Sequence, residues 1–210
     1  RLGDPAIFAA QPDFMRDSIH SSRFKWRWDT PEKYQHNMRN YLRMISGIDT
    51  VVGRVIQTVK DAGLYHNTIF IFSADNGYYA GNRGFAGKWT HYDESLRVPL
   101  IVFDPRQNDA RQVSQIALNA DITPTILEYA GLDIPKHYHG RSLKPFVDGH
   151  TPGDWRTEFL GEFCGGIGSI PDWEGIHGER YVYARYFDND YEFLHDLNKD
   201  PDQLENLVSN

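Results

Sequence analysis

The 210-residue sequence has one cysteine, Cys164, no long run of basic residues and no long apolar run. A single thiol excludes an intrachain disulfide framework and a cysteine-rich zinc site. The formal net charge of −7 argues against a protein that binds nucleic acid through a basic surface. No apolar stretch approaches the ~20 residues that a membrane-spanning helix needs. What remains is a globular protein with an ordinary hydrophobic core, because 40% of its residues are hydrophobic.

The N-terminal part of the chain offers one clear helix signal. Residues 1–29 show no hydrophobic period, so we expect a loop that lies on the body of the protein. Residues 30–32, Thr-Pro-Glu, then combine an N-cap, a proline for the first turn and an acid. Apolar residues recur three, four or seven positions apart after that point, which predicts a helix over residues 31–62 that ends at Gly63. These apolar residues are Met38, Leu42, Ile45, Val52, Ile56 and Val59.

Two later segments are typical of strands inside a sheet. Residues 68–74 are apolar on both faces, which predicts a buried central strand of a parallel sheet. Residues 99–103 form a second such run, and residues 113–118 form a weaker one. A helix is expected over residues 122–130, ended by Gly131. Helices and strands that follow one another in this way indicate an α/β fold.

The C-terminal part of the sequence changes in texture. Short aromatic runs, separated by glycine, asparagine and aspartate, predict a small antiparallel sheet from residues 158–163, 180–187 and 191–197. We therefore divide the chain into an α/β part, residues 1–150, and an antiparallel subdomain, residues 151–210. The α/β part offers two or three strands, whereas an average sheet has about five or six. The chain thus looks like part of a larger fold.

The most informative polar residues follow the first predicted strand. Asp75 and Asn76 come just past its C-terminal end, where ligands bind in open α/β sheets. A carboxylate beside an amide oxygen suits Ca²⁺ or Mg²⁺. The next loop is rich in glycine and in aromatic rings that can stack on a sugar or aryl group, and Lys88 can neutralise an anionic group. The alternative interpretation is an ordinary Asp-Asn-Gly turn with a surface lysine.

Several motifs follow one another along the chain in a characteristic order: Ile48–Val55, Thr68–Gly77, Gly87-Lys88, Tyr92–Leu100, Asp121–Thr125 with Ala130-Gly131, Gly140–Leu143, and His195–Pro201 with Glu205–Leu207. Each motif alone is moderately specific. Their order and spacing together resemble the second half of the sulfatase family, over roughly residues 35–207.

The resemblance implies a fold and a chemistry. Sulfatases share the alkaline-phosphatase-like α/β fold, with a mostly parallel central sheet and a small C-terminal antiparallel subdomain. They hydrolyse sulfate esters or sulfamates with a formylglycine made from Cys or Ser, beside a calcium ion. Carried over to this chain, Asp75 and Asn76 would be metal ligands for Ca²⁺ or Mg²⁺, and Lys88 would contact the sulfate and the leaving oxygen. The resemblance favours a periplasmic, secreted or lysosomal location.

Two neighbours of Lys88 are further candidates. As a catalytic residue, His91 would reach the leaving group or a sugar hydroxyl; it fits equally well as a partly buried histidine at a helix start. Trp89 is assigned, with Lys88, to substrate binding. The expected substrate is a sulfated carbohydrate or an aryl sulfate.

The family's nucleophile motif, Cys/Ser-x-Pro-x-Arg, is absent. Cys164 is followed by Gly-Gly-Ile-Gly, and Ser169 begins a near match that has Trp173 where arginine is needed. The chain therefore resembles the C-terminal half of a sulfatase, with the formylglycine and further metal ligands in a missing N-terminal half. Alone it is expected to be inactive, since two oxygens cannot hold a cation that takes about six to eight. Two alternatives stay open: a phosphodiesterase or phosphonate hydrolase of the same superfamily, and a non-catalytic degenerate domain.

Several other polar residues are given structural interpretations. We expect His137 and His139 in a surface loop, Arg97 as an anchor of a strand entrance, Cys164 as a small packed residue, and Asp188, Asp190 and Glu192 in a solvated turn.

Overall fold

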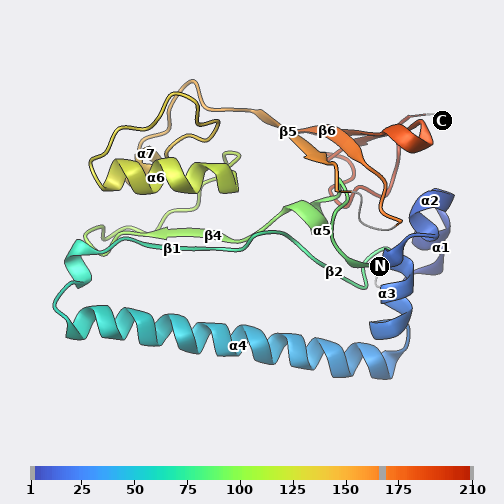
Figure 1. The fold of residues 1–210 in the computed structure, drawn as a ribbon, viewed down its shortest axis with the longest axis horizontal. Coiled ribbons are helices and arrows are strands. Elements are labelled where there is room, and N and C mark those ends of the chain that lie inside the picture. The colour runs from blue at the N-terminus through green and yellow to red at the C-terminus, as the bar shows by residue number, and fades with distance from the viewer. Residues whose placement is uncertain (1–2, 166–168, 209–210) are drawn as a thin grey trace. The chain divides into compact units, whose positions relative to one another are not determined.

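The computed structural model describes residues 3–165 and 169–208. The chain forms two compact units (Figure 1). Unit 1 comprises residues 1–48, 76–97 and 158–210, and unit 2 comprises residues 49–75 and 98–157. The mixed α/β character expected from the sequence is confirmed. The division of the protein into domains at about residue 150 stays a prediction.

The loop predicted for residues 1–29 is wrong, because this segment contains three short helices: α1 (Pro5–Ala9), α2 (Asp13–Arg16) and α3 (Ile19–Arg27). Capping residues explain two of them. The Asp4 side chain accepts a hydrogen bond from the amide of Ala6, and the Ser18 hydroxyl accepts one from the amide of His20. Helices of four to nine residues are too short to show a hydrophobic period, so the periodicity missed them.

The long helix is confirmed as α4 (Pro31–Asp61). It begins at the predicted N-cap, where the Thr30 hydroxyl accepts a hydrogen bond from the amide of Lys33, and Gly63 follows it with φ +69°. None of its residues, all of which the structure describes, is buried. Large apolar side chains on it are exposed, namely Tyr41, Leu42, Met44, Ile45, Ile48, Val51 and Val55. Within the described residues, this helix has no cover for its apolar stripe.

The two predicted sheet strands are present as β1 (Phe70–Ser73) and β4 (Leu100–Phe103). They pair with each other in antiparallel orientation, with Phe70 opposite Phe103, so the prediction of a buried strand with parallel neighbours is wrong for this pair (Figure 1). Every residue of both strands is half-buried or exposed, and Ile101 is 57% exposed. Strands this apolar require further partners, which the described residues do not supply.

The strand predicted at residues 113–118 is also wrong, because that segment is irregular. Its backbone is hydrogen-bonded to side chains rather than to a neighbouring strand. The carbonyl of Ile116 accepts hydrogen bonds from the Trp155 indole and the Arg156 guanidinium, at 2.8 and 3.2 Å. The helix predicted next is confirmed as α6 (Ile122–Tyr129), which follows the short η2 (Asn119–Asp121); α7 (Lys144–Val147) was not predicted.

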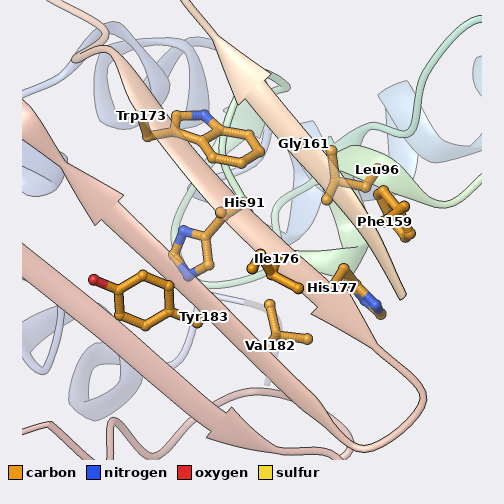
Figure 2. Close-up of a pocket in the computed structure, with 10 residues that line it drawn as sticks. His91, Leu96, Phe159, Gly161, Trp173, Ile176, His177, Val182 and Tyr183 are labelled. Atoms are coloured by element: carbon orange, nitrogen blue, oxygen red, sulfur yellow. The ribbon is translucent and has the colours of Figure 1, made fainter. Parts of the chain in front are cut away.

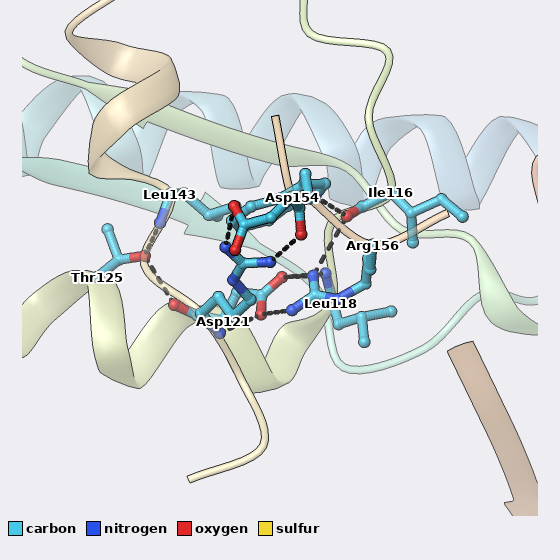
Figure 3. Close-up of polar contacts among 9 residues, drawn as sticks. Ile116, Leu118, Asp121, Thr125, Leu143, Asp154 and Arg156 are labelled. Carbon is cyan, nitrogen blue, oxygen red and sulfur yellow. Dashed lines mark hydrogen bonds and ion pairs between the residues drawn. The ribbon is translucent and has the colours of Figure 1, made fainter. Parts of the chain in front are cut away.

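A buried carboxylate joins three segments of unit 2 (Figure 3). The Asp121 side chain is fully buried and accepts two hydrogen bonds from the guanidinium of Arg156, at 2.6 and 2.7 Å. The backbone amides of Leu118 and Arg141 also donate to it, at 2.8 and 2.7 Å. Charge-assisted bonds on both oxygens offset the cost of burying this charge.

The C-terminal antiparallel sheet is confirmed, with four strands in the order β5-β6-β7-β8. Three of them match the predicted runs, and β6 was missed because its two glycines weaken a strand pattern. Gly175 is required there, since a Cβ at that position would lie 2.3 Å from the carbonyl oxygen of Tyr183. The strands are β5 (Glu158–Phe163), β6 (Trp173–Gly178), β7 (Tyr181–Tyr186) and β8 (Tyr191–Asp196).

The core of unit 1 joins this sheet to the glycine- and aromatic-rich loop and to α2. Its buried members are Met15, Tyr79, Phe85, Tyr92, Trp173, Ala184, Tyr186 and Phe193. Most of the loop's aromatic rings are therefore core residues, and Trp89 and Tyr78 are the ones that keep exposed surface. The loop contains two short paired strands, β2 (Tyr79–Ala80) and β3 (Ala86–Gly87), and leads into α5 (Asp93–Leu96).

Candidate functional site

Asp75 and Asn76 follow β1, which ends at Ser73. Asp75 is the last residue of unit 2, and its side chain is exposed. The turn before it is fixed by Asn119, whose amide nitrogen donates to the carbonyls of Ala74 and Asp75, each at 3.1 Å. The backbone at this point is therefore held by unit 2, while the Asp75 carboxylate stays available.

Asn76 begins the part of unit 1 that contains Lys88. The ammonium of Lys88 donates a hydrogen bond to the side-chain oxygen of Asn76, so two of the predicted site residues meet. Gly77 makes the close backbone approach possible: its amide donates to the carbonyl of Ser95 at 2.8 Å, and a Cβ there would lie 2.3 Å from the carbonyl oxygen of Glu94. Only glycine fits at that position without a shift of the backbone.

Trp89 is held in an uncommon backbone conformation, with φ +87°. Its amide donates to the hydroxyl of Ser95 at 2.7 Å, and its carbonyl accepts a hydrogen bond from the indole of Trp173 at 2.8 Å. The Lys88 ammonium lies 5.6 Å from the centroid of the Trp89 ring. Strain of this kind costs about 1–3 kcal/mol and persists where surrounding contacts impose it, which is common at functional sites.

The donor set of Asp75 and Asn76 has the right chemistry for a hard cation but is incomplete. One carboxylate and one amide oxygen are ligands that Ca²⁺ or Mg²⁺ accepts. Among the described residues, no group of three or more His, Cys, Asp or Glu side chains could hold a metal ion. Asp75 and Asn76 therefore supply two candidate donors and no more, and Lys88 is hydrogen-bonded to the Asn76 oxygen.

His91 lies in the core of unit 1 and is 1% exposed (Figure 2). One ring nitrogen is hydrogen-bonded to the hydroxyl of Tyr186 at 2.9 Å, and the other lies 3.4 Å from a ring nitrogen of His195. Burial lowers the pKa of His91 well below its usual value, and the neighbouring charges of His195, Arg83 and His177 lower it further. This placement favours the structural interpretation of His91.

A small cavity lies beside His91 (Figure 2). Leu96, Phe159, Ile176 and His177 are among the side chains that line it. Its volume for water-sized molecules is about 10 Å³, which holds no more than one water. This cavity is too small to bind a substrate.

Of the polar residues expected at the surface, most are exposed and one is not. His137 and His139 are exposed, and so are Asp188 and Asp190. Glu192 is instead half-buried on β8, where its carboxylate accepts a hydrogen bond from the Tyr183 hydroxyl at 2.9 Å.

Two interpretations are wrong. Cys164 is exposed rather than packed, because it follows the end of β5. The side chain of Arg97 is 80% exposed and pairs with Asp93 at 3.6 Å, so it does not anchor the strand entrance.

The sequence analysis missed Arg83, which is 2% exposed in the core of unit 1. Its guanidinium donates to the carbonyls of Gln203 and Asp202 and lies 3.8 Å from the centroid of the Tyr92 ring. The two carbonyls are more than a hundred residues away along the chain, so no local pattern could have indicated them. Arg83 fastens the C-terminal segment to the loop that carries Lys88.

Comparison with known proteins gives two overlapping family matches. The model described as "N-sulphoglucosamine sulphohydrolase, C-terminal" matches residues 81–210, and the model described as "Sulfatase" matches residues 11–132. An N-acetylglucosamine-6-O-sulfatase of Bacteroides thetaiotaomicron is 31% identical over an alignment of 186 positions, which covers 83% of this chain and 32% of that protein. The chain spans about a third of the length of the curated relatives that it matches over most of its own length.

Two solved structures extend the likeness to the fold. One, solved in complex with its substrate D-glucosamine-2-N,6-O-disulfate, has a TM-score of 0.78 and 30% identity, over 83% of this chain and 37% of that chain. The other, a phosphonate monoester hydrolase from Silicibacter pomeroyi, has a TM-score of 0.84 and 26% identity, over 99% of this chain and 45% of that chain.

Proposed function

Because this chain belongs to the sulfatase family and has its alkaline-phosphatase-like α/β fold, we propose that it is the C-terminal portion of an enzyme that hydrolyses sulfate esters. The observation that carries the proposal is the contact between Lys88 and Asn76. It joins a cation to a hard oxygen donor at the end of β1, where this fold class binds ligands.

We assign Asp75 and Asn76 to a divalent cation, Ca²⁺ or Mg²⁺. The exposed carboxylate of Asp75 and the side-chain oxygen of Asn76 are the donors that this chain supplies. The other ligands, and the formylglycine, belong to a portion of the protein that precedes this chain. When bound, such a cation stabilises negative charge on the oxygens of the sulfuryl group.

The role of Lys88 is to bind the sulfate and to oppose negative charge on the leaving oxygen. Its ammonium is half-buried and held by Asn76, so it is oriented before substrate arrives. A preorganised donor of this kind stabilises a transition state more than water does, because the protein need not reorganise. Trp89, next in the chain and partly exposed, offers a ring face for the sugar or aryl part of the substrate.

A second candidate is hydrolysis of phosphonate or phosphate diesters. The phosphonate monoester hydrolase from Silicibacter pomeroyi is as similar in fold as the sulfatases are. Lys88 and a divalent cation would serve a tetrahedral phosphorus centre in the same way. The two candidates therefore differ in the part of the protein that this chain does not contain.

The decisive experiment assays the complete polypeptide on 4-nitrophenyl sulfate and on a phenyl phosphonate ester, beside the isolated 210-residue chain. We expect turnover of the sulfate by the complete polypeptide and none by the isolated chain. Preference for the phosphonate would favour the second candidate. Turnover of neither ester, by protein that carries both formylglycine and metal, would contradict a hydrolase of either kind.

A further inference from the structure

The segment 18–28 is a cationic stretch in an otherwise acidic chain. It contains Arg23, Lys25 and Arg27 and no acidic residue, although the formal net charge of the whole chain is −7. The cations lie on α3, in unit 1. Of the three, Arg23 is the one that lies against the candidate site.

Arg23 lies beside Trp89, with the carbon of its guanidinium 5.0 Å from the centroid of the Trp89 ring. The Lys88 ammonium lies 5.6 Å from the ring of the same tryptophan. The two cations therefore lie beside the same indole, no farther apart than the sum of these two distances. A single small substrate can span that separation.

Gly87 and His20 define the surroundings of Arg23. Gly87, with φ +118°, leaves room for it, because a Cβ at that position would lie 3.3 Å from a guanidinium nitrogen of Arg23. His20, one turn earlier on α3 and 2% exposed, places a ring nitrogen 3.3 Å from the carbonyl of Ala86. This contact anchors α3 to β3. Burial lowers the pKa of His20 to about 4, so the ring is neutral at pH 7 and the positive charge at this point belongs to Arg23.

No carboxylate neutralises this arginine. Within residues 3–165 and 169–208, Arg23 makes no ion pair and donates no hydrogen bond, and its side chain is only half-buried. A guanidinium carries five N–H donors in a planar fork that matches carboxylate and sulfate oxygens. An arginine with no acidic partner among these residues has N–H donors available for an anionic group of a ligand.

We propose that Arg23 is a specificity-determining residue, which binds a second anionic group of the substrate while Lys88 binds the sulfate that is cleaved. Its ligand is a sulfate or a carboxylate on the same sugar or on the adjoining one, and both cations lie near the ring of Trp89. The substrate class is therefore a sugar with at least two anionic groups. This inference rests on the proposed function, because it takes Lys88 as the residue that binds the cleaved sulfate.

The test compares substrates in the complete polypeptide. The probes are glucosamine with sulfate on O6 alone, the same sugar with sulfate on N2 and O6, and the 6-sulfate linked to a uronic acid. Wild type should prefer one of the probes with two anionic groups, and which of them it prefers identifies the second group as sulfate or carboxylate. In Arg23→Ala, the ratio of kcat/KM for that probe over the monosulfate should fall about ten- to a hundredfold, since a hydrogen-bonded charge is lost. Arg23→Lys should recover part of the ratio, because the charge returns without the fork.

Arg27→Ala is the matched control, since Arg27 lies one turn further along α3 and rests on the exposed Trp26. It should leave the ratio within about twofold of wild type. A ratio unchanged in Arg23→Ala, or a wild type that shows no preference, would overturn the inference. An equal loss on all three probes would also overturn it, because it would assign Arg23 a structural role.

Calorimetric binding of the same probes separates this inference from the proposed function. If the complete polypeptide hydrolyses neither these probes nor 4-nitrophenyl sulfate, the proposed function fails. A Kd for the preferred probe that weakens about tenfold or more in Arg23→Ala, but not in Arg27→Ala, would still support the anion subsite. A Kd that is the same in all variants would overturn the subsite, whatever the activity.

Discussion

The ammonium of Lys88 donates a hydrogen bond to the side-chain oxygen of Asn76, twelve residues earlier in the chain. Asn76 follows the strand β1, whereas Lys88 follows β3, so the contact closes the loop that contains both short strands. It places the Lys88 ammonium, which is assigned to bind the sulfate, beside the Asn76 oxygen, which is assigned to bind the metal. The predictions on both residues depend on this relationship.

Lys88→Ala should reduce kcat on an aryl sulfate by a factor of about 10²–10³, which corresponds to ~3–4 kcal/mol, because a donor aimed at transition-state charge is removed. Lys88→Arg should recover only part of the rate, since a planar fork does not replace a compact ammonium in a confined site. The measurement is kcat of the complete polypeptide, with metal content determined in parallel.

The exposed Lys199 provides a matched control for that experiment, and Lys199→Ala should leave kcat unchanged. A loss smaller than about threefold in Lys88→Ala would place Lys88 outside the reaction. The Asp-Asn-Gly segment would then be an ordinary turn.

Asp75→Ala and Asn76→Ala should each weaken binding of the divalent cation by at least about tenfold in the complete polypeptide, because each removes an oxygen ligand. Metal content after dialysis, measured by elemental analysis, reports the loss. Asp109→Ala is the control, since Asp109 lies in an exposed loop of unit 2. Full metal content in both site variants would remove these residues from the metal site.

Asp121→Asn should destabilise the protein by about 3–5 kcal/mol, because it leaves the half-buried guanidinium of Arg156 without its charged partner (Figure 3). The comparison is Asp154→Asn, which breaks the ion pair between Asp154 and Arg141. Because the Asp154 side chain is 80% exposed, this change should lower the free energy of unfolding by no more than about 1 kcal/mol. Urea unfolding measures both. Equal losses of unfolding free energy in the two variants would show that the contribution of Asp121 to stability does not depend on its burial.

The stability of unit 1 should fall as the pH drops below about 6.5, the pKa of an unfolded histidine. Burial is the main cause that lowers the pKa of both His91 and His195 in the folded protein. The unfolded chain therefore binds protons that the folded chain does not, and each histidine contributes up to about 1.4 kcal/mol of lost stability per pH unit below that value.

His91→Asn should be less stable than wild type at pH 7.5, because it leaves a gap in the core, but should lose less stability between pH 7.5 and pH 5. Thermal unfolding at the two pH values measures the difference. His137→Asn alters an exposed loop histidine and should keep the wild-type pH dependence. Parallel pH profiles for wild type and His91→Asn would mean that His91 binds a proton as readily in the folded protein as in the unfolded chain.

The sequence predicted the strand β1 but not which strands lie beside it. The run at residues 68–74 is apolar on both faces, which correctly indicates a strand, observed as β1. Its neighbours are not fixed by that pattern. Within the described residues its partner is β4, which runs antiparallel, and Phe72 and Ile101 remain exposed.

The sequence alone determined the elements whose signals are local. The spacing of apolar residues defined α4, the β-rich run defined β1, and the order of motifs made Asp75, Asn76 and Lys88 candidate site residues. Each of these signals is a pattern of neighbours, which backbone geometry converts directly into a helix, a strand or a turn.

Only the tertiary structure decided which side chains meet across long stretches of chain. Arg83 contacts carbonyls about 120 residues away, and His91 pairs with Tyr186 and His195 in the core. Arg23 reaches Trp89 because Gly87 leaves space beside α3. Such contacts depend on how elements pack, and no local pattern records packing between distant segments. For this reason the sequence left two interpretations of His91 open, and it did not indicate Arg23 as a candidate site residue.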